Sequence, residues 1–435
     1  MASPVFWRRS WTAAGVYVSA LLGFAGSIVA FRELGTYDFG LLSILLAATG
    51  FFQLFADLTV EEAVIKYGFR YAAREDWGRF RRVFRAGFGL KVAGGLLGAV
   101  GIAILAPLSH LIWAHGLTVP MLVAALLPVA QAPEGVASAA LIVRRRYDVR
   151  AAFLAVSQAL RLGALAVGCA FGVLEAVVAL LVAQALSTAA IGTASLVALR
   201  RFPAGAPEPL GEDAAGFRRF VVQSSLGSVL SPMRGLLGTL LLGVVTGPRQ
   251  VGWFRVAQVP ESAFASASAP VRMVLLTEQT HDFERGRSDR VYRMLRRYVF
   301  GAAGLMALVL PPLLWLMPEL LRIAFGADAK PAANAARLML LVAAIQLVWG
   351  WAKSFPVSIG RPALRLVAQG TEIVVLVPAL LVLGAAYGAT GAGGAFLIAA
   401  VAFAGCWTAI LVRLRREPPR PDARPGPAPV DAVVP

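Results

Sequence analysis

The chain has 435 residues, of which 58% are hydrophobic and only 15% are charged, and its mean hydropathy is +0.71. Because a soluble protein carries about 25% charged residues, this composition excludes an ordinary soluble domain. The formal net charge of +17 does not indicate a nucleic-acid-binding protein, since the basic residues stand in bursts between apolar stretches. The two cysteines, Cys169 and Cys406, each lie inside an apolar stretch, which argues against a disulfide framework or a cysteine-based metal site.

Apolar stretches of about 20 residues recur along the chain, and this length matches a helix that crosses the hydrocarbon core of a bilayer. An unbroken apolar run satisfies its own backbone groups in lipid by forming a helix. The first stretch is longer than the apolar core of a signal peptide, so we expect it to be retained. The predicted spans are residues 10–31, 41–63, 86–106, 117–142, 151–172, 174–199, 219–245, 253–276, 298–318, 335–352, 363–386 and 394–413.

Arginine and lysine gather in every second gap between these spans, whereas gaps such as 109–118 and 387–393 hold almost none. Basic gaps face the cytoplasm under the positive-inside rule. All basic gaps fall on one side only if the number of spans is even and both termini are cytoplasmic. The pattern therefore predicts a multi-pass protein of the bacterial inner membrane with both termini in the cytoplasm.

The prolines of residues 202–216 mark a linker near the middle of the chain. We predict an N-terminal lobe of helices 1–6 at residues 1–201, a cytoplasmic linker at 202–216 and a C-terminal lobe of helices 7–12 at 217–416. The proline-rich tail at 417–435 is predicted to be disordered. The predicted fold class is an all-α polytopic membrane protein with about twelve transmembrane helices in two six-helix lobes.

Two segments, Gly35–Leu41 and Gly247–Trp253, have similar sequences and stand before the second and the eighth span. Repeated halves of this kind are typical of transporters, which hold their substrate between the two halves.

Arginines inside the spans are candidates for binding an anionic substrate, since a charge at mid-bilayer costs roughly 2.5–3.5 kcal/mol and usually marks a pathway. Arg234, just after Pro232, would grip phosphate oxygens in a central cavity or form an ion pair between two helices. Arg161 would face the cavity or pair with Glu134. The predicted cationic cavity contains Arg234, Arg161, Arg255, Arg32 at its rim, and Arg272.

Acidic residues inside the spans are candidates for ion coupling or gating. Glu134 and Glu261 each follow a proline, and a carboxylate beside a proline-loosened turn would bind a coupling proton or sodium ion or be paired locally. The acids near the end of the second span would form a cytoplasmic gate or simply lie at the membrane interface. The predicted coupling or gating residues are Glu261, Glu134, Asp57, Glu61 and Glu372.

Five motifs stand in order along the chain: Arg32-Glu33-Leu34-Gly35 with Tyr37 and Gly40; Gly247-Pro248 with Val251-Gly252; Ile323-Ala324-Phe325-Gly326 followed by Ala332 and Ala335; Gly360-Arg361-Pro362; and Tyr387-Gly388-Ala389-Thr390-Gly391-Ala392. Together they resemble the loop motifs of the polysaccharide flippases in the multidrug/oligosaccharidyl-lipid/polysaccharide (MOP) exporter superfamily. The resemblance implies a V-shaped fold and transport of a polyprenyl-pyrophosphate-linked oligosaccharide or related glycolipid to the outer leaflet by alternating access.

We accordingly expect a transporter and not an enzyme, with no bound cofactor or metal and no nucleic-acid partner. The sequence contains no Walker A loop, so a proton gradient, a sodium gradient or the membrane potential would drive transport. The expected partners are the lipid-linked glycan, membrane lipids, and the polymerase and glycosyltransferases of the same pathway.

Four alternatives make different predictions. A drug/cation antiporter of the same superfamily would have a cavity of acids and aromatics, whereas mid-span arginines favour an anionic cargo. The peptidoglycan-precursor branch usually has two further helices, which are not evident here. A major-facilitator transporter carries a glycine/aspartate/arginine signature that residues 67–85 lack. A non-transporting scaffold would require every buried arginine to be paired.

Overall fold

The computed structural model describes residues 4–56, 59–268, 275, 278, 279, 282, 288–353, 355–359, 361 and 363–416. Most of these residues are helical, and none of them forms a strand. Nine stretches among them are long and apolar enough to cross a membrane. The protein is therefore an all-α, multi-pass membrane protein, as its apolar runs predict. The tail at 417–435 lies outside the described residues.

The helices follow the predicted spans in order. The first half of the chain forms α1 (Pro4–Ala56), α2 (Val60–Ala73), α3 (Trp77–Leu105), α4 (Ser109–Ile112), α5 (Thr118–Ala124), α6 (Leu126–Val143), α7 (Tyr147–Gly168) and α8 (Val173–Arg200). The second half forms α9 (Asp213–Thr246), α10 (Pro248–Ala257), α11 (Val259–Ala267), α13 (Ser288–Phe325), α14 (Ala333–Val348), α15 (Phe355–Ser358) and α16 (Ala363–Arg416). Short 3₁₀ turns lie at η1 (Ala106–Leu108), η2 (Ala327–Ala332) and η3 (Gly350–Lys353).

Two long helices, α1 and α16, each contain two predicted spans. The chain turns back at Gly35 (φ 72°) in α1 and at Gly388 (φ 58°) in α16, where a side chain would disfavour the left-handed backbone. The nine membrane-crossing stretches thus cover eleven of the twelve predicted spans. The remaining span, 253–276, falls on α10, on α11 and on residues outside the described ranges.

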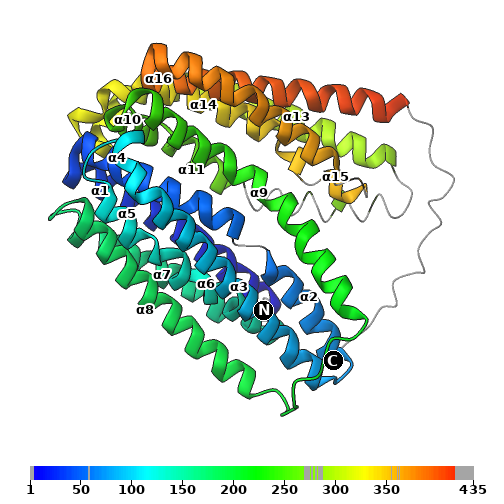
Figure 1. Ribbon diagram of the computed structural model, residues 1–435. Coiled ribbons are helices and arrows are strands. Elements are labelled where there is room, and N and C mark those ends of the chain that lie inside the picture. Colours follow the sequence, from blue (N-terminus) through cyan, green and yellow to red (C-terminus); the bar gives the residue numbers. More distant parts are fainter. Residues whose placement is uncertain are drawn as a thin grey trace.

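Figure 1 shows the helices as two groups that meet at one end and diverge toward the other. In the first group α1 packs against α3 and α7, and α8 packs against α6 and α7. In the second group α16 packs against α9 and α14, and α13 packs against α14. We call these groups the N-terminal and C-terminal lobes. They form the V-shaped arrangement that was predicted.

The predicted linker is shorter than expected, because α9 begins at Asp213 and not after residue 216. The carboxylate of Asp213 accepts hydrogen bonds from Arg70 Nη1 at 2.9 Å and from the Tyr71 hydroxyl at 2.7 Å. These contacts hold the first turn of α9 against α2. Proline-based boundary prediction does not detect such a tertiary contact.

The lobes meet most closely where α1 passes α10. A Cβ atom on Gly40 would lie 1.9 Å from the carbonyl oxygen of Pro248, and one on Gly252 would lie 2.2 Å from the carbonyl oxygen of Thr36. The contact is reciprocal, since each glycine meets the residue that follows the turn glycine of the other segment. The two similar segments noted in the sequence therefore pack against each other as structural equivalents.

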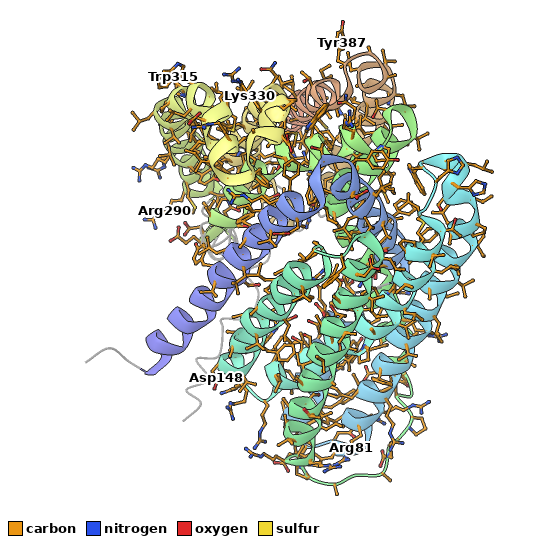
Figure 2. The ribbon with its side chains drawn as sticks, turned by 90° about the vertical axis from the view of Figure 1, so that its left-hand side faces the viewer. Arg81, Asp148, Arg290, Trp315, Lys330 and Tyr387 are labelled. Atoms are coloured by element: carbon orange, nitrogen blue, oxygen red, sulfur yellow. The ribbon has the colours of Figure 1, made fainter. Side chains whose placement is uncertain are left out.

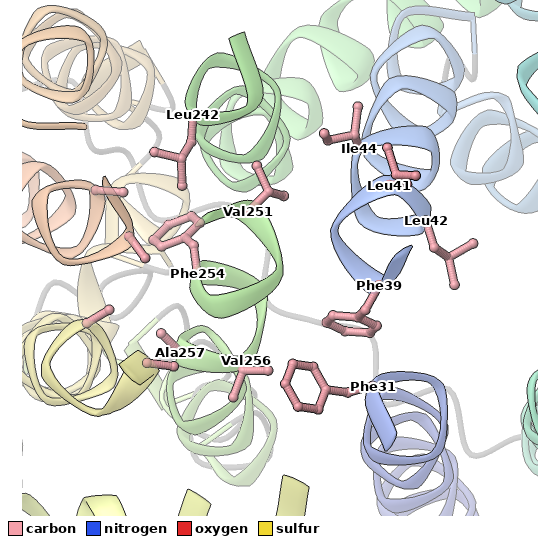
Figure 3. Close-up of a cluster of buried hydrophobic side chains, with 14 of the residues drawn as sticks. Phe31, Phe39, Leu41, Leu42, Ile44, Leu242, Val251, Phe254, Val256 and Ala257 are labelled. Atoms are coloured by element: carbon pink, nitrogen blue, oxygen red, sulfur yellow. The ribbon is translucent and has the colours of Figure 1, made fainter. Parts of the chain in front are cut away.

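Apolar side chains fill the space around this contact. Figure 3 shows Phe31 and Phe39 of α1 facing Val256 of α10, whereas Phe254 points to the opposite side of α10. The rings of Phe31 and Phe39 meet edge to face with centroids 5.4 Å apart. This dry contact joins the lobes at the end of the molecule opposite the arginine-rich turns.

Hydrogen bonds within the C-terminal lobe hold α10 in place at this end. Gln250 Oε1 accepts from the backbone N–H of Ala389 at 2.9 Å, which ties α10 to the turn inside α16. Trp253 Nε1 donates to the carbonyl oxygen of Asp328 at 3.1 Å. Figure 2 shows the two ends of the molecule, with Arg81 and Asp148 at one and Tyr387 at the other.

Turns with left-handed backbone occur at matching places in the two halves. In the first half, successive turns between helices contain Gly35, Gly116 and Gly172. In the second half, the corresponding turns contain Gly247, Gly326 and Gly388. All six have positive φ values, which glycine adopts without steric cost. The order and conformation of these glycines support an internal repeat of six helices.

We predict that Gly40→Ala destabilises the protein by about 1–3 kcal/mol, because the added methyl group would collide with backbone at Pro248. Unfolding in mixed detergent micelles, followed by tryptophan fluorescence, measures this change. Gly301→Ala is the matched control, since no atom lies within 4 Å of its added Cβ. Equal stability of the two variants would show that the close approach is unimportant.

Candidate functional site

Two adjacent hollows lie between the lobes and share the lining residues Ser27 and Arg255. One has a volume of about 120 Å³ and is lined by α1, α7, α9 and α10, with Thr239 on the α9 side. The other has a volume of about 190 Å³ and is lined by α1, α10 and α11, with Ser262 on the α11 side. We call the two together the central hollow.

Arg255 is the one charged residue among the described residues that line the central hollow. Its Nη1 donates to Gln258 Oε1 at 3.0 Å, and no carboxylate within the described part of the chain forms an ion pair with it. A guanidinium carries five N–H donors, so most of them are left for a ligand. The positive charge and the remaining N–H donors of Arg255 are suited to binding an anionic ligand.

Arg161 lies within α7 and is partly buried, one helical turn after Gln158. Glu134 of α6 attracts it electrostatically, but the two form no direct ion pair. Glu134 Oε2 instead accepts a hydrogen bond from Gln184 Nε2 at 2.9 Å. The two predicted alternatives were that Arg161 faces the cavity or that it pairs with Glu134. The structure places Arg161 near Glu134 without a direct ion pair between them.

Arg234 of α9 belongs to a different group, within the C-terminal lobe. Its guanidinium forms ion pairs with Glu372 of α16 at 3.1 Å and with Glu261 of α11. The amide of Gln346 lies against the same guanidinium with its oxygen as acceptor, and the ring of Phe396 lies 5.3 Å from it. We call this group the Arg234 cluster.

The Arg234 cluster corresponds to the ion-pair alternative for this arginine. Its arginine side chain is 13% exposed and each glutamate side chain 11%, so water contributes little to their solvation. Buried charges of this kind require partners with good geometry. The cluster joins α9, α11, α14 and α16, and two carboxylates share a single guanidinium. Arg234 therefore presents no free positive charge to the central hollow.

A polar hollow of about 150 Å³ lies within the N-terminal lobe. Its lining includes Glu61, Lys91, Glu134 and Arg150, two acids and two bases from α2, α3, α6 and α7. Gly135 leaves room for these groups, because a Cβ there would lie 2.7 Å from Glu61 Oε2 and 3.2 Å from Lys91 Nζ. The structure thus brings two predicted gating acids, Glu61 and Glu134, to one site.

Three other predicted residues are not part of these groups. Arg32 lies just before the turn at Gly35 inside α1, where its Nη2 donates to the carbonyl oxygen of Ile323 at 2.7 Å. A cation at this place stabilises the carboxyl end of α13. This contact gives Arg32 a structural role, whereas the sequence predicted it at the rim of the cavity. Arg272 and Asp57 lie outside the described residues.

Polar contacts also join α2 to α9, on the side of the molecule where the lobes diverge. Ser225 Oγ accepts from the backbone N–H of Thr59 at 3.0 Å, Ser224 donates to Glu62, and Lys66 Nζ lies 4.2 Å from the ring centroid of Phe220. Nearby, burial and the hydrogen bond to Asp213 raise the pKa of the Tyr71 hydroxyl above its usual range. Tyr71 therefore stays protonated and donates to this carboxylate at physiological pH.

Sequence reasoning missed three residues of these groups: Lys91, Gln184 and Gln346. Lys91 is only 5% exposed although it is a lysine. Its signal in the sequence was a single basic residue inside the apolar run 86–106. Gln184 and Gln346 are likewise isolated amides inside apolar spans. A search for every polar residue within a span, and not only for arginines and acids, would have found all three.

The fold resembles that of several solved membrane transporters. The lipid II flippase MurJ in an inward closed conformation superposes with a TM-score of 0.74 at 11% identity, covering 94% of this chain and 88% of that one. A MOP superfamily transporter from Pyrococcus furiosus, described as having a binding pocket of reverse polarity, gives 0.63 at 14% identity, covering 93% and 94%. The MATE multidrug transporter DinF-BH gives 0.62 at 18% identity, covering 95% and 96%.

These similarities and the V-shaped arrangement define the class: the protein has the fold of MOP superfamily transporters. A family model described as polysaccharide biosynthesis protein matches residues 9–276, which is more than half of the chain. The chain belongs to this family. No curated protein matches it in a sequence comparison.

We predict that Arg234→Ala destabilises the folded protein by about 3–5 kcal/mol, since it removes the cation that two buried carboxylates contact. Unfolding in mixed micelles measures the loss, and Arg249→Ala, which removes an exposed arginine, is the control. The triple variant R234L/E261Q/E372Q should recover most of the stability. An Arg234→Ala protein as stable as the control would contradict the ion-pair assignment.

Proposed function

We propose that the protein is a flippase that moves a polyprenyl-pyrophosphate-linked oligosaccharide, or a related glycolipid, from the cytoplasmic to the outer leaflet of the bacterial inner membrane. The observation that carries this proposal is Arg255, an arginine without a carboxylate partner among the described residues that faces the hollow between the lobes. The Arg255 side chain is accessible within the hollow, so its positive charge is available to the phosphate of a ligand. A guanidinium binds phosphate oxygens in pairs.

The other lining groups suit the remainder of such a molecule. Gln258, Ser262 and Ser266 lie beside Arg255 and offer hydrogen bonds to sugar hydroxyl groups. The polyprenyl chain stays in the surrounding lipid, since each of its methylene groups favours an apolar environment. Arg161 of α7 lines neither part of the central hollow, and we keep it as a second candidate for substrate binding.

Alternating access requires each end of the molecule to open in turn. The structure has contacts at both ends: the glycine contact of α1 with α10 at one end, and the polar contacts of α2 with α9 at the other. We propose that the arginine-rich end faces the cytoplasm, with both termini on that side. Breaking the α2–α9 contacts would admit the substrate there.

The comparisons support this proposal at the level of the family. The matching family model describes polysaccharide biosynthesis proteins, and one similar structure is a flippase for lipid II. In such a pathway glycosyltransferases would supply the lipid-linked glycan and a polymerase would consume it. We propose these enzymes as functional partners.

A cation-exporting function is less well supported. A cationic drug would require acids or an electron-rich aromatic surface at the centre, whereas the charge found there among the described lining residues is Arg255. Acids are present, but they are held inside the lobes, by Arg234 in one and beside Lys91 and Arg150 in the other.

We predict that Arg255→Gln reduces flipping by about tenfold or more while the protein remains folded, because a charge-assisted phosphate contact is lost. Proteoliposomes that contain a fluorescent polyprenyl-pyrophosphate disaccharide measure flipping as the fraction exposed to a membrane-impermeant quencher. Arg249→Gln is the matched control, as it removes an exposed arginine from the same helix. Normal flipping by Arg255→Gln would refute the proposed grip on phosphate.

We further propose that the Arg234 cluster couples transport to a proton gradient. In the cluster the guanidinium of Arg234 contacts the carboxylates of Glu261 and Glu372, so a proton taken up by either carboxylate would weaken that contact. Uptake and release of this proton would change how tightly α9 is held to α11 and α16.

We predict that Glu372→Gln makes flipping independent of an imposed pH gradient, since the amide mimics a permanently protonated carboxyl group. The proteoliposome assay tests this with and without a pH gradient, and Glu319→Gln, which changes an exposed glutamate of α13, is the control. Continued dependence on the gradient in Glu372→Gln would refute proton coupling at this cluster. So would loss of wild-type flipping when sodium is replaced by choline.

A further inference from the structure

A hollow separate from the central one opens on the outside of the N-terminal lobe. Its volume is about 360 Å³, and it lies between the arginine-rich ends of α6, α7 and α8. Apolar residues form its walls, including Leu141 of α6, Val149 of α7 and Val197 of α8. Beneath it, buried side chains such as Leu141 and Ala198 form a small core, which gives the hollow a fixed floor.

The hollow opens toward lipid. On α8, Val178, Val182, Leu186 and Val197 are exposed at helical spacings and form an apolar stripe that ends at the hollow. Figure 1 shows α8 at the outer edge of the N-terminal lobe, away from the C-terminal lobe. An exposed apolar stripe on a membrane-spanning helix lies against acyl chains. A lipid chain that follows this stripe would therefore reach the hollow.

Three arginines line the hollow at its arginine-rich end: Arg144, Arg146 and Arg201. Arg144 stacks at 5.1 Å on the ring of Phe202, which fixes its position without using its positive charge. Arg146 pairs with the exposed Asp148 at 3.1 Å, so the group retains a net positive charge. Arg201 is exposed. Three guanidinium groups above an apolar wall match a phosphate headgroup above an acyl chain.

We propose that this hollow is a binding site for an anionic phospholipid of the inner leaflet, with its phosphate held by Arg144, Arg146 and Arg201. One acyl chain would lie along the apolar stripe of α8. The site does not depend on the proposed transport function, because it shares no lining residue with the central hollow. A lipid there would hold the ends of α6, α7 and α8 together.

Native mass spectrometry of the full chain in detergent, with added phosphatidylglycerol or phosphatidylcholine, tests this proposal. The wild type should retain one phosphatidylglycerol about tenfold more tightly than phosphatidylcholine, and the variant R144Q/R146Q/R201Q should lose this preference. The control R290Q/R293Q/R297Q removes the same charge from α13 and should keep the preference. Ala194→Phe fills the hollow and leaves the arginines in place, so it should also abolish retention.

Two outcomes would overturn the proposal. If the α13 control loses the preference as fully as the α6–α8 variant, the lipids respond only to overall charge. If Ala194→Phe retains phosphatidylglycerol like the wild type, the hollow is not where the lipid binds. A single symmetric peak in size-exclusion chromatography confirms that each variant is folded before the measurement.

Discussion

A charge inside the membrane must be neutralised, and this constraint explains how the ionisable residues are distributed. In the C-terminal lobe, Arg234 is held by two glutamates. In the N-terminal lobe, two acids and two bases share one polar hollow. Each lobe therefore holds these intramembrane acids and bases next to one another. Arg255, which faces the space between the lobes, has no carboxylate partner among the described residues.

The contacts that close the two ends of the molecule differ in kind. At the end where α1 meets α10, backbone packs on backbone through Gly40 and Gly252, and buried aromatic rings surround the contact. At the arginine-rich end, α2 and α9 are joined by hydrogen bonds and an ion pair in which Arg70 is 42% exposed. Water can replace exposed polar contacts at little cost, whereas separating a dry packed contact exposes apolar surface. The arginine-rich end should therefore open more readily in this state.

Most of the fold follows from the sequence, because apolar length and the placement of arginines depend on the bilayer and not on tertiary detail. The turn glycines at 35 and 247 were visible as a repeated pattern, and their structural equivalence agrees with it. The site was harder to predict. A sequence shows that Arg234 and Arg255 are both intramembrane arginines, but not that Glu372, far along the chain, returns to pair with only one of them. Pairing between distant helices decides which charge is free, and spacing along one helix carries no information about it.

Helix α9 connects the features on which the proposed mechanism depends. Its first turn is fixed to α2 by Asp213, its middle carries Arg234 of the charged cluster, and Thr239, further along the helix, lines the central hollow. All three points lie on one helix, which contains Pro232 two residues before Arg234. A proton that loosens the grip of Glu261 or Glu372 on Arg234 would thus act on the wall of the hollow and on the α2–α9 closure together. Since α9 belongs by sequence to the second half but docks at its start on the first, it is the element that would link ion binding to opening in the proposed mechanism.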